Sequence, residues 1–100
     1  MKKLKEVPTT LYCIKVDYFM WSEEKGEYTE PLYWCLDDSK HQIVIFEEDI
    51  NFHGLRVFDN LKSIQTYMKK HDVWNALNYE NPQIVKIAYN YGKQKWEEVG

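Results

Sequence analysis

The feature that most restricts the fold is a long stretch near the amino terminus in which apolar and polar positions alternate. Within residues 11–21 the even-numbered side chains are all apolar or aromatic: Tyr12, Ile14, Val16, Tyr18 and Met20. Alternation with a period of two is typical of a β-strand with one buried face, whereas a helix has a period of 3.6 residues. The sequence therefore predicts a long strand over residues 11–21.

A hairpin is predicted after this strand. Residues 22–27 are polar, and Gly26 suits the left-handed position of a three-residue loop at 24–26. An apolar pattern resumes over residues 28–37. A slip of one residue would turn Trp34 outward, so one buried face limits the register. The expected cross-strand pairs, all on that face, are Tyr18 with Leu32, Val16 with Trp34 and Ile14 with Leu36.

Further runs predict the remaining strands. Residues 42–46 form a β-branched run typical of a third strand, and residues 55–58 are predicted as a brief fourth one. Residues 84–89 and 95–99 predict a second hairpin. With Tyr91-Gly92 as its loop, Ile87 faces Trp96 and Lys86 faces Glu97, and neighbouring registers stay open.

One segment has the spacing of an amphipathic helix. Leu61, Ile64 and Met68 recur at i, i+3 and i+7, behind a capping residue at 59 or 60. These positions predict a helix over residues 60–71. Residues 72–79 are predicted to add a helical turn or two, ending before Asn81-Pro82.

The order of these elements predicts an α+β fold of the ββββ-α-ββ type. We expect an antiparallel sheet of about five strands, its fourth strand short, with the helix packed on one face. The helix should contact apolar side chains of the first hairpin, namely Ile14, Val16, Trp34 and Leu36. One core suits a chain of 100 residues. A single domain is therefore expected over 1–100, with a flexible segment at 1–8.

Charge and hydropathy exclude several classes of protein. The formal net charge of -3 argues against a dedicated nucleic-acid binder. No apolar run approaches the roughly 18 residues of a membrane span, and Val7-Pro8 stands where a signal peptide would continue its apolar core. A cytoplasmic protein without a membrane partner is expected. Its single arginine, Arg56, beside twelve lysines indicates an AT-rich gene, as in a low-GC bacterium or its phage.

Cysteine and histidine positions predict no catalytic residue, metal or cofactor. In the expected register Cys13 lies diagonal to Cys35, at a Cβ separation of about 7 Å, too long for a disulfide. Both are predicted to be reduced, half-buried thiols. Neither lies at zinc-ligand spacing from His41 or His53, and no phosphate-binding loop is present.

The second face of the first hairpin provides the candidate site. One helix covers one face, so the aromatic residues on the other need a cover: the 47–54 loop, the amino-terminal segment, a second copy or a different protein. Aromatic anchors beside charged residues are typical of protein interfaces. We predict a partner-binding surface made of Phe19, Trp21, Tyr33, Lys15 and Asp17.

Three functions fit these observations. The first is a non-catalytic module, encoded by a phage or mobile element, that binds or inhibits a protein partner or forms a homodimer. The second is a small-ligand-binding or enzymatic domain. The third is an acidic mimic of nucleic acid, based on the carboxylates at 23–24, 37–38, 47–49 and 97–98.

Overall fold

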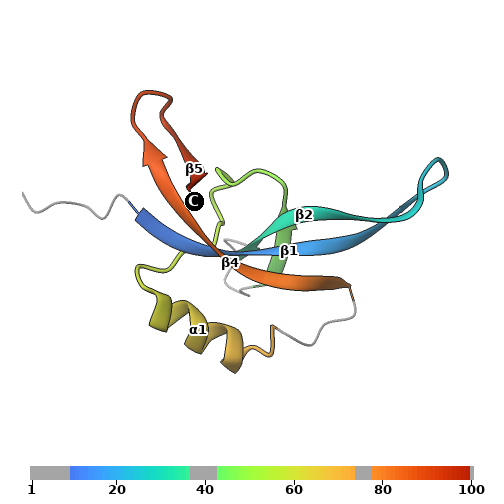
Figure 1. Ribbon diagram of the computed structural model, residues 1–100, viewed down its shortest axis with the longest axis horizontal. Helices are drawn as coiled ribbons and strands as arrows, with labels where there is room; N and C mark the ends of the chain where they lie inside the picture. Colours follow the sequence, from blue (N-terminus) through green and yellow to red (C-terminus); the bar gives the residue numbers. More distant parts are fainter. Residues whose placement is uncertain (1–9, 37–42, 74–77, 100) are drawn as a thin grey trace, which may run out of the picture.

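The computed structural model describes residues 10–36, 43–73 and 78–99 and contains a five-stranded antiparallel sheet (Figure 1). The elements are β1 (Thr10–Ser22), β2 (Gly26–Leu36), β3 (Val44–Glu47), α1 (Leu61–Lys70), β4 (Tyr79–Asn90) and β5 (Lys95–Val99). The strand order is β3-β2-β1-β4-β5, which places β1 at the centre. The predicted α+β class is confirmed. The expected short strand at 55–58 is instead two isolated bridges, Cys35 with Leu55 and Tyr12 with Phe58.

Helix α1 covers one face of the sheet. Asn60 caps it, because its side-chain oxygen accepts a hydrogen bond of 2.8 Å from the Ser63 amide. Ile64 and Met68 are fully buried. They pack with residues that the other elements supply, namely Ile14, Val16, Trp34, Phe58, Val73 and Tyr79. The predicted docking of α1 on the even-numbered side of β1 is therefore confirmed.

Two residues expected in this contact lie outside it. Leu61 is the first residue of the helix and is 47% exposed. The side chains that α1 buries are those of Ile64 and Met68. Leu36 is only half-buried at the end of β2. The helix therefore contributes fewer core residues than its spacing predicts.

The loop between β3 and α1 covers the opposite face (Figure 1). Its residues Ile50, Phe52, Leu55 and Val57 pack against a buried cluster in the sheet. That cluster consists of Cys13, Tyr33, Cys35 and Ile87. Gly54 permits the loop to approach closely, since a Cβ there would overlap the Leu36 carbonyl oxygen. One of the predicted covers, the loop, thus encloses the inner half of this face.

The loop also joins the ends of β1 and β2. The β1–β2 pairing runs inward from the hairpin loop and stops at Lys15 and Tyr33. Beyond that point the backbone of residues 54–58 bonds to both strands. The four bonds are Tyr12 N to Phe58 O and Phe58 N to Tyr12 O at 2.8 Å, Leu36 N to Gly54 O at 2.7 Å, and Arg56 N to Trp34 O at 3.1 Å.

Both hairpins differ from the predicted register by two residues. In the first, Val16 pairs with Leu32 and Ser22 with Gly26, so the loop is 23–25 and Gly26, with φ of 68°, begins β2. In the second, the turn is 91–94. It pairs Ile87 with Glu98, Tyr89 with Trp96 and Lys86 with Val99. An even shift leaves every side chain on its expected face.

Strand β4 begins earlier than predicted. The helical turns expected to reach residue 79 are wrong at their carboxyl end, because Tyr79 already pairs with Tyr18. Residues 74–77 lie outside the described part. Asn81 and Pro82 fall inside β4 at a register shift, where Asn81 has a φ of 55° and donates a side-chain bond of 3.1 Å to Asp17. A left-handed residue at a bulge is conformationally acceptable for asparagine, which explains how the strand accommodates Asn-Pro.

Candidate interaction surface

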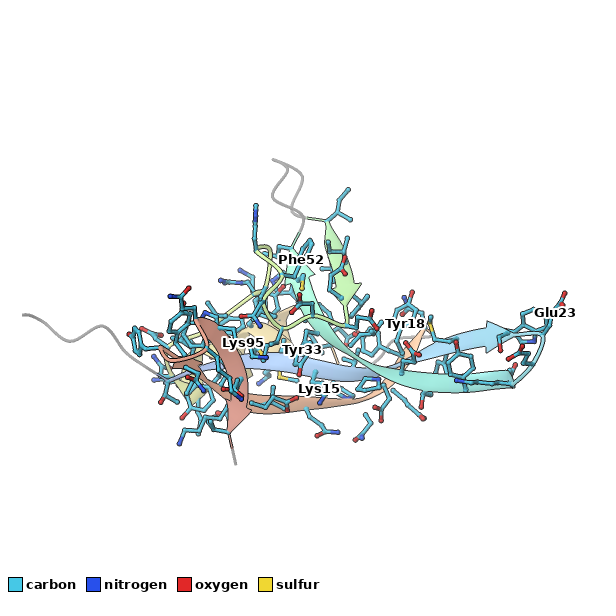
Figure 2. The ribbon with its side chains drawn as sticks, turned by 90° about the horizontal axis from the view of Figure 1, so that it is seen from above. Lys15, Tyr18, Glu23, Tyr33, Phe52 and Lys95 are labelled. Carbon is cyan, nitrogen blue, oxygen red and sulfur yellow. The ribbon has the colours of Figure 1, made fainter. Side chains whose placement is uncertain are left out.

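The outer half of the β1–β2 hairpin, residues 19–30, extends beyond the rest of the sheet, and we call it the arm (Figure 1). On one side β4 pairs with β1 only as far as Tyr18, and on the other side β3 pairs with β2 only from Tyr33. The described part of the molecule measures 61 × 32 × 29 Å, and the arm extends along the longest axis. Figure 2 shows Glu23 at its far end, distant from Tyr33 and Phe52.

Two large aromatic residues are exposed on the arm. Phe19 is 46% exposed and Trp21 is 67% exposed. They are two residues apart on β1, so they share one face, and their cross-strand neighbours are Thr29 and Glu27. On the other face Met20 and Tyr28 pair with each other and are half-buried. The exposed apolar surface of the arm is therefore concentrated on the Phe19–Trp21 face.

The arm also carries the acidic charge of the chain. Its charged residues are Glu23, Glu24, Lys25, Glu27 and Glu30, which give a net charge of -3. The whole chain has the same net charge, so the remaining residues are neutral in sum. The arm therefore combines two exposed aromatic rings with four carboxylates, one of which, Glu27, pairs with Trp21 on the same face.

Lys15 and Tyr33, which the sequence placed on the same surface, lie at the inner end of the hairpin. The Lys15 ammonium is 2.7 Å from a Glu98 carboxylate oxygen of β5, and the Tyr33 hydroxyl donates to that same oxygen. Tyr33 is only 8% exposed. Its ring lies 5.4 Å from the Lys15 nitrogen. Lys15, Tyr33 and Glu98 therefore form a polar cluster, separate from the arm.

The electrostatics of this cluster favour an ionised Glu98. Partial burial acts to raise the pKa of Glu98, but hydrogen bonds from Lys15 and Tyr33 and the charge of Lys15 outweigh it and hold that pKa below its usual value. Burial, and then the bond to Glu98, raise the pKa of Tyr33 far above its usual value. Asp17, the fifth predicted site residue, bonds to Asn81 at the bulge.

The structure thus divides the predicted surface into three places. Phe19 and Trp21 remain together on the arm, Lys15 and Tyr33 meet Glu98, and Asp17 lies between them. The sequence analysis did not predict that Glu98 binds Lys15, because a glutamate in the last strand carries no local signal of a partner 83 positions away. The cluster is an ion pair with a hydroxyl donor, which suits a structural link between β1, β2 and β5.

The thiols are unsuited to nucleophilic chemistry. Cys13 and Cys35 are both free, but the expectation that they are half-buried is wrong, because the loop and the sheet enclose them fully. Burial is the largest cause that raises the pKa of each to about 12. A thiol is reactive as its thiolate, so these groups are inert at neutral pH. Within residues 10–36, 43–73 and 78–99, no group of three or more histidine, cysteine or acidic residues is placed to hold a metal ion. No helix in those ranges is long and apolar enough to cross a membrane.

A hollow of about 240 Å³ lies between the loop and β5. Apart from Asn51 and His53, the side chains that line it are apolar: Leu11, Ile50, Phe52, Leu55, Val57 and Trp96. The Asn51 side chain is hydrogen-bonded to the backbone of Trp96: its nitrogen donates to the Trp96 carbonyl oxygen, and its oxygen accepts from the Trp96 amide. This hollow is smaller than the roughly 300–1,000 Å³ of most ligand sites.

Comparison with known proteins finds no matching family model, no similar curated protein and no similar solved structure. The class of protein is therefore defined by its own geometry: an antiparallel α+β domain with one helix, one covering loop and a projecting hairpin arm.

Proposed function

We propose that this protein is a non-catalytic interaction module that binds a partner protein through the arm. The observation that carries the proposal is the exposure of Phe19 and Trp21 on a part of the sheet that no described element covers. Large aromatic rings contribute much of the binding energy at protein interfaces, because they bury a large rigid area with little loss of side-chain entropy.

Side-chain docking fits the arm better than strand addition. The outer edge of β2 before Tyr33 has no strand beside it in the described ranges. This edge contains Pro31, which has no amide hydrogen, together with Glu27 and Glu30. Proline and charged residues are the features that protect edges from pairing with another strand. The face with Phe19 and Trp21 is therefore the contact surface.

The negative charge of the arm indicates what kind of partner surface it fits. Two arms, each with a net charge of -3, would repel each other in a symmetric contact. A different protein with an apolar pocket bordered by lysine or arginine would be complementary to both the rings and the carboxylates. We therefore propose such a protein as the partner. A cytoplasmic location accords with two buried, reduced thiols.

The experiment compares quantitative capture of partners by three forms of the protein. The Phe19→Ser/Trp21→Ser variant removes both exposed rings, and Tyr91→Ser removes a ring that is 66% exposed on the β4–β5 turn. We expect one partner to be retained by the parent and by Tyr91→Ser but lost by the arm variant. With that partner purified, Trp21→Ala should weaken binding about 30-fold, as for an interface hot spot.

Thermal unfolding serves as the folding control, since exposed residues of the arm should change stability by less than about 1 kcal/mol. The proposal is wrong if the folded arm variant keeps every association of the parent. It is also wrong if the arm variant only abolishes a homodimer seen by light scattering, because the repulsion argument then fails.

A further inference from the structure

A second surface, beside α1, has the features of an anion site. Figure 1 shows α1 on one face of the sheet and away from the arm. A groove of about 390 Å³ runs between α1 and the segment that precedes it. Its lining is Arg56, Phe58, Lys62, Ser63, Thr66 and Tyr67. We propose that this groove binds the phosphate group of a small phosphorylated molecule. The proposal is independent of the arm and of its partner.

Arg56 is held in place but has no counter-charge among the described residues. Its guanidinium carbon lies 4.5 Å from the centre of the Phe58 ring and 5.2 Å from that of Tyr67. Its backbone amide bonds to Trp34. The Nε atom is buried and has no hydrogen-bond partner. An anion in the groove would supply the counter-charge that this guanidinium lacks among the described residues.

The helix contributes the other donors. Lys62, Ser63 and Thr66 all lie in the first two turns of α1 and line the same groove as Arg56. The Tyr67 hydroxyl accepts a bond of 3.1 Å from the Trp34 indole, so its own proton is available to donate. The lining therefore combines two basic side chains with three hydroxyl groups and contains no carboxylate.

This donor set fits a phosphate better than a carboxylate. A phosphomonoester carries close to two negative charges at neutral pH and presents three oxygen acceptors. The planar arginine donates in pairs, and lysine acts as a compact point charge. A carboxylate has one charge and two oxygens, which would leave part of the set unpaired. The groove is larger than a phosphate group, so the remainder of the ligand would lie along the half-buried Tyr67 ring.

The nearest acid in the sequence does not neutralise the site. Asp59 follows Phe58 directly, and its carboxylate accepts a bond of 3.1 Å from the Asn60 side chain. It is exposed and is not part of the groove lining. The local balance therefore remains positive in a chain whose net charge is -3.

The test titrates the isotopically labelled protein with phenyl phosphate, inorganic phosphate and benzoate at pH 7.5 and follows its amide resonances. We expect saturable shifts at residues 56–67 with phenyl phosphate, at least about tenfold weaker binding of inorganic phosphate, and no binding of benzoate. Inorganic phosphate binding as tightly as phenyl phosphate would mean that the free ion is the ligand, and this would overturn the proposal of an organic phosphate.

Variants identify the groups responsible. Arg56→Gln and Lys62→Gln should each weaken the binding of phenyl phosphate at least tenfold. Lys69→Gln, an equal change of charge at an exposed position of the same helix, should leave that binding unchanged. If Arg56→Gln fails to fold, Arg56→Lys replaces it, since it retains the charge and loses the paired donors. Unchanged affinity in the Arg56 or Lys62 variant, equal binding of benzoate, or shifts confined to other residues would overturn the proposal.

Discussion

Single residues in this protein acquire partners from distant parts of the chain. Glu98 is the clearest case, because one carboxylate oxygen accepts from Lys15 and Tyr33 and so joins β5 to β1 and β2. A carboxylate with two such donors is more stable ionised than protonated, which is the physical reason that its pKa lies below the usual value. The bond network therefore makes part of the folding free energy depend on pH.

Replacing Glu98 with glutamine should reveal this contribution. The folded-state pKa of Glu98 lies below its unfolded value of about 4.5. Its stabilisation is therefore present above pH 4.5 and is lost as the pH falls through the folded pKa. Because its side chain is 35% exposed, we expect Glu98→Gln to cost only about 1 kcal/mol at pH 7.

Urea unfolding of parent and variant from pH 7 to pH 3 measures the difference, which should shrink below about pH 4.5. Glu48→Gln, at an exposed position, is the control and should match the parent throughout. A difference for Glu98→Gln that is as large at pH 3 as at pH 7 would contradict the assignment.

At the level of elements, two covers enclose the sheet by different means. Helix α1 packs two fully buried side chains, Ile64 and Met68, on one face. The loop covers the other face with apolar side chains and holds its position with backbone bonds to β1 and β2. The helix depends on side-chain burial for its attachment, so its docking should be sensitive to single truncations.

We predict that Ile64→Ala costs about 2–5 kcal/mol of stability, the usual range for truncating a fully buried aliphatic residue. Leu61→Ala, three positions earlier and 47% exposed, should cost less than about 1 kcal/mol. Chemical unfolding of the two variants gives both values. Equal losses would show that α1 does not dock through the face described here.

For the whole molecule, the important asymmetry is between the doubly covered centre and the uncovered arm. The core clusters lie where the helix and the loop oppose each other across β1. Beyond Phe19, whose amide still donates to the Asn78 carbonyl oxygen at 3.0 Å, the arm has only its own two strands beside it among the described residues. Two-stranded hairpins are marginally stable in water, so the arm should open more easily than the sheet to which it belongs.

Hydrogen exchange measures this difference residue by residue. Hydrogen-bonded amides within 20–30 should exchange at least about 100-fold faster than those of Cys13 and Ile14 at the centre of the sheet. Binding of a partner to the arm should slow exchange there without changing the centre. Uniform protection along the whole of β1 would contradict the description of the arm as a separately opening part.

The candidate surface was only partly predictable. Alternation along residues 11–21, together with the hairpin predicted to pair them with 28–37, placed Phe19, Trp21 and Tyr33 on one face, and the structure keeps them there. The sequence could not show that the loop covers Tyr33 and leaves the other two open, because loop position depends on contacts such as the close approach of Gly54 to Leu36. The groove beside Arg56 gave no signal, since its lining comes from two segments of different structure.

The sequence by itself determined the class of fold, the helix and the face to which each side chain of the first hairpin belongs. These properties follow from local periodicity, which each segment carries independently of the rest. Only the tertiary structure decided the registers of both hairpins and the bulge at Asn81-Pro82. It also decided that the backbone of residues 54–58 bonds to β1 and β2 where these strands no longer pair with each other. A shift of two residues preserves the buried face, so the hydrophobic pattern cannot distinguish such registers, and the choice depends on contacts between distant parts of the chain.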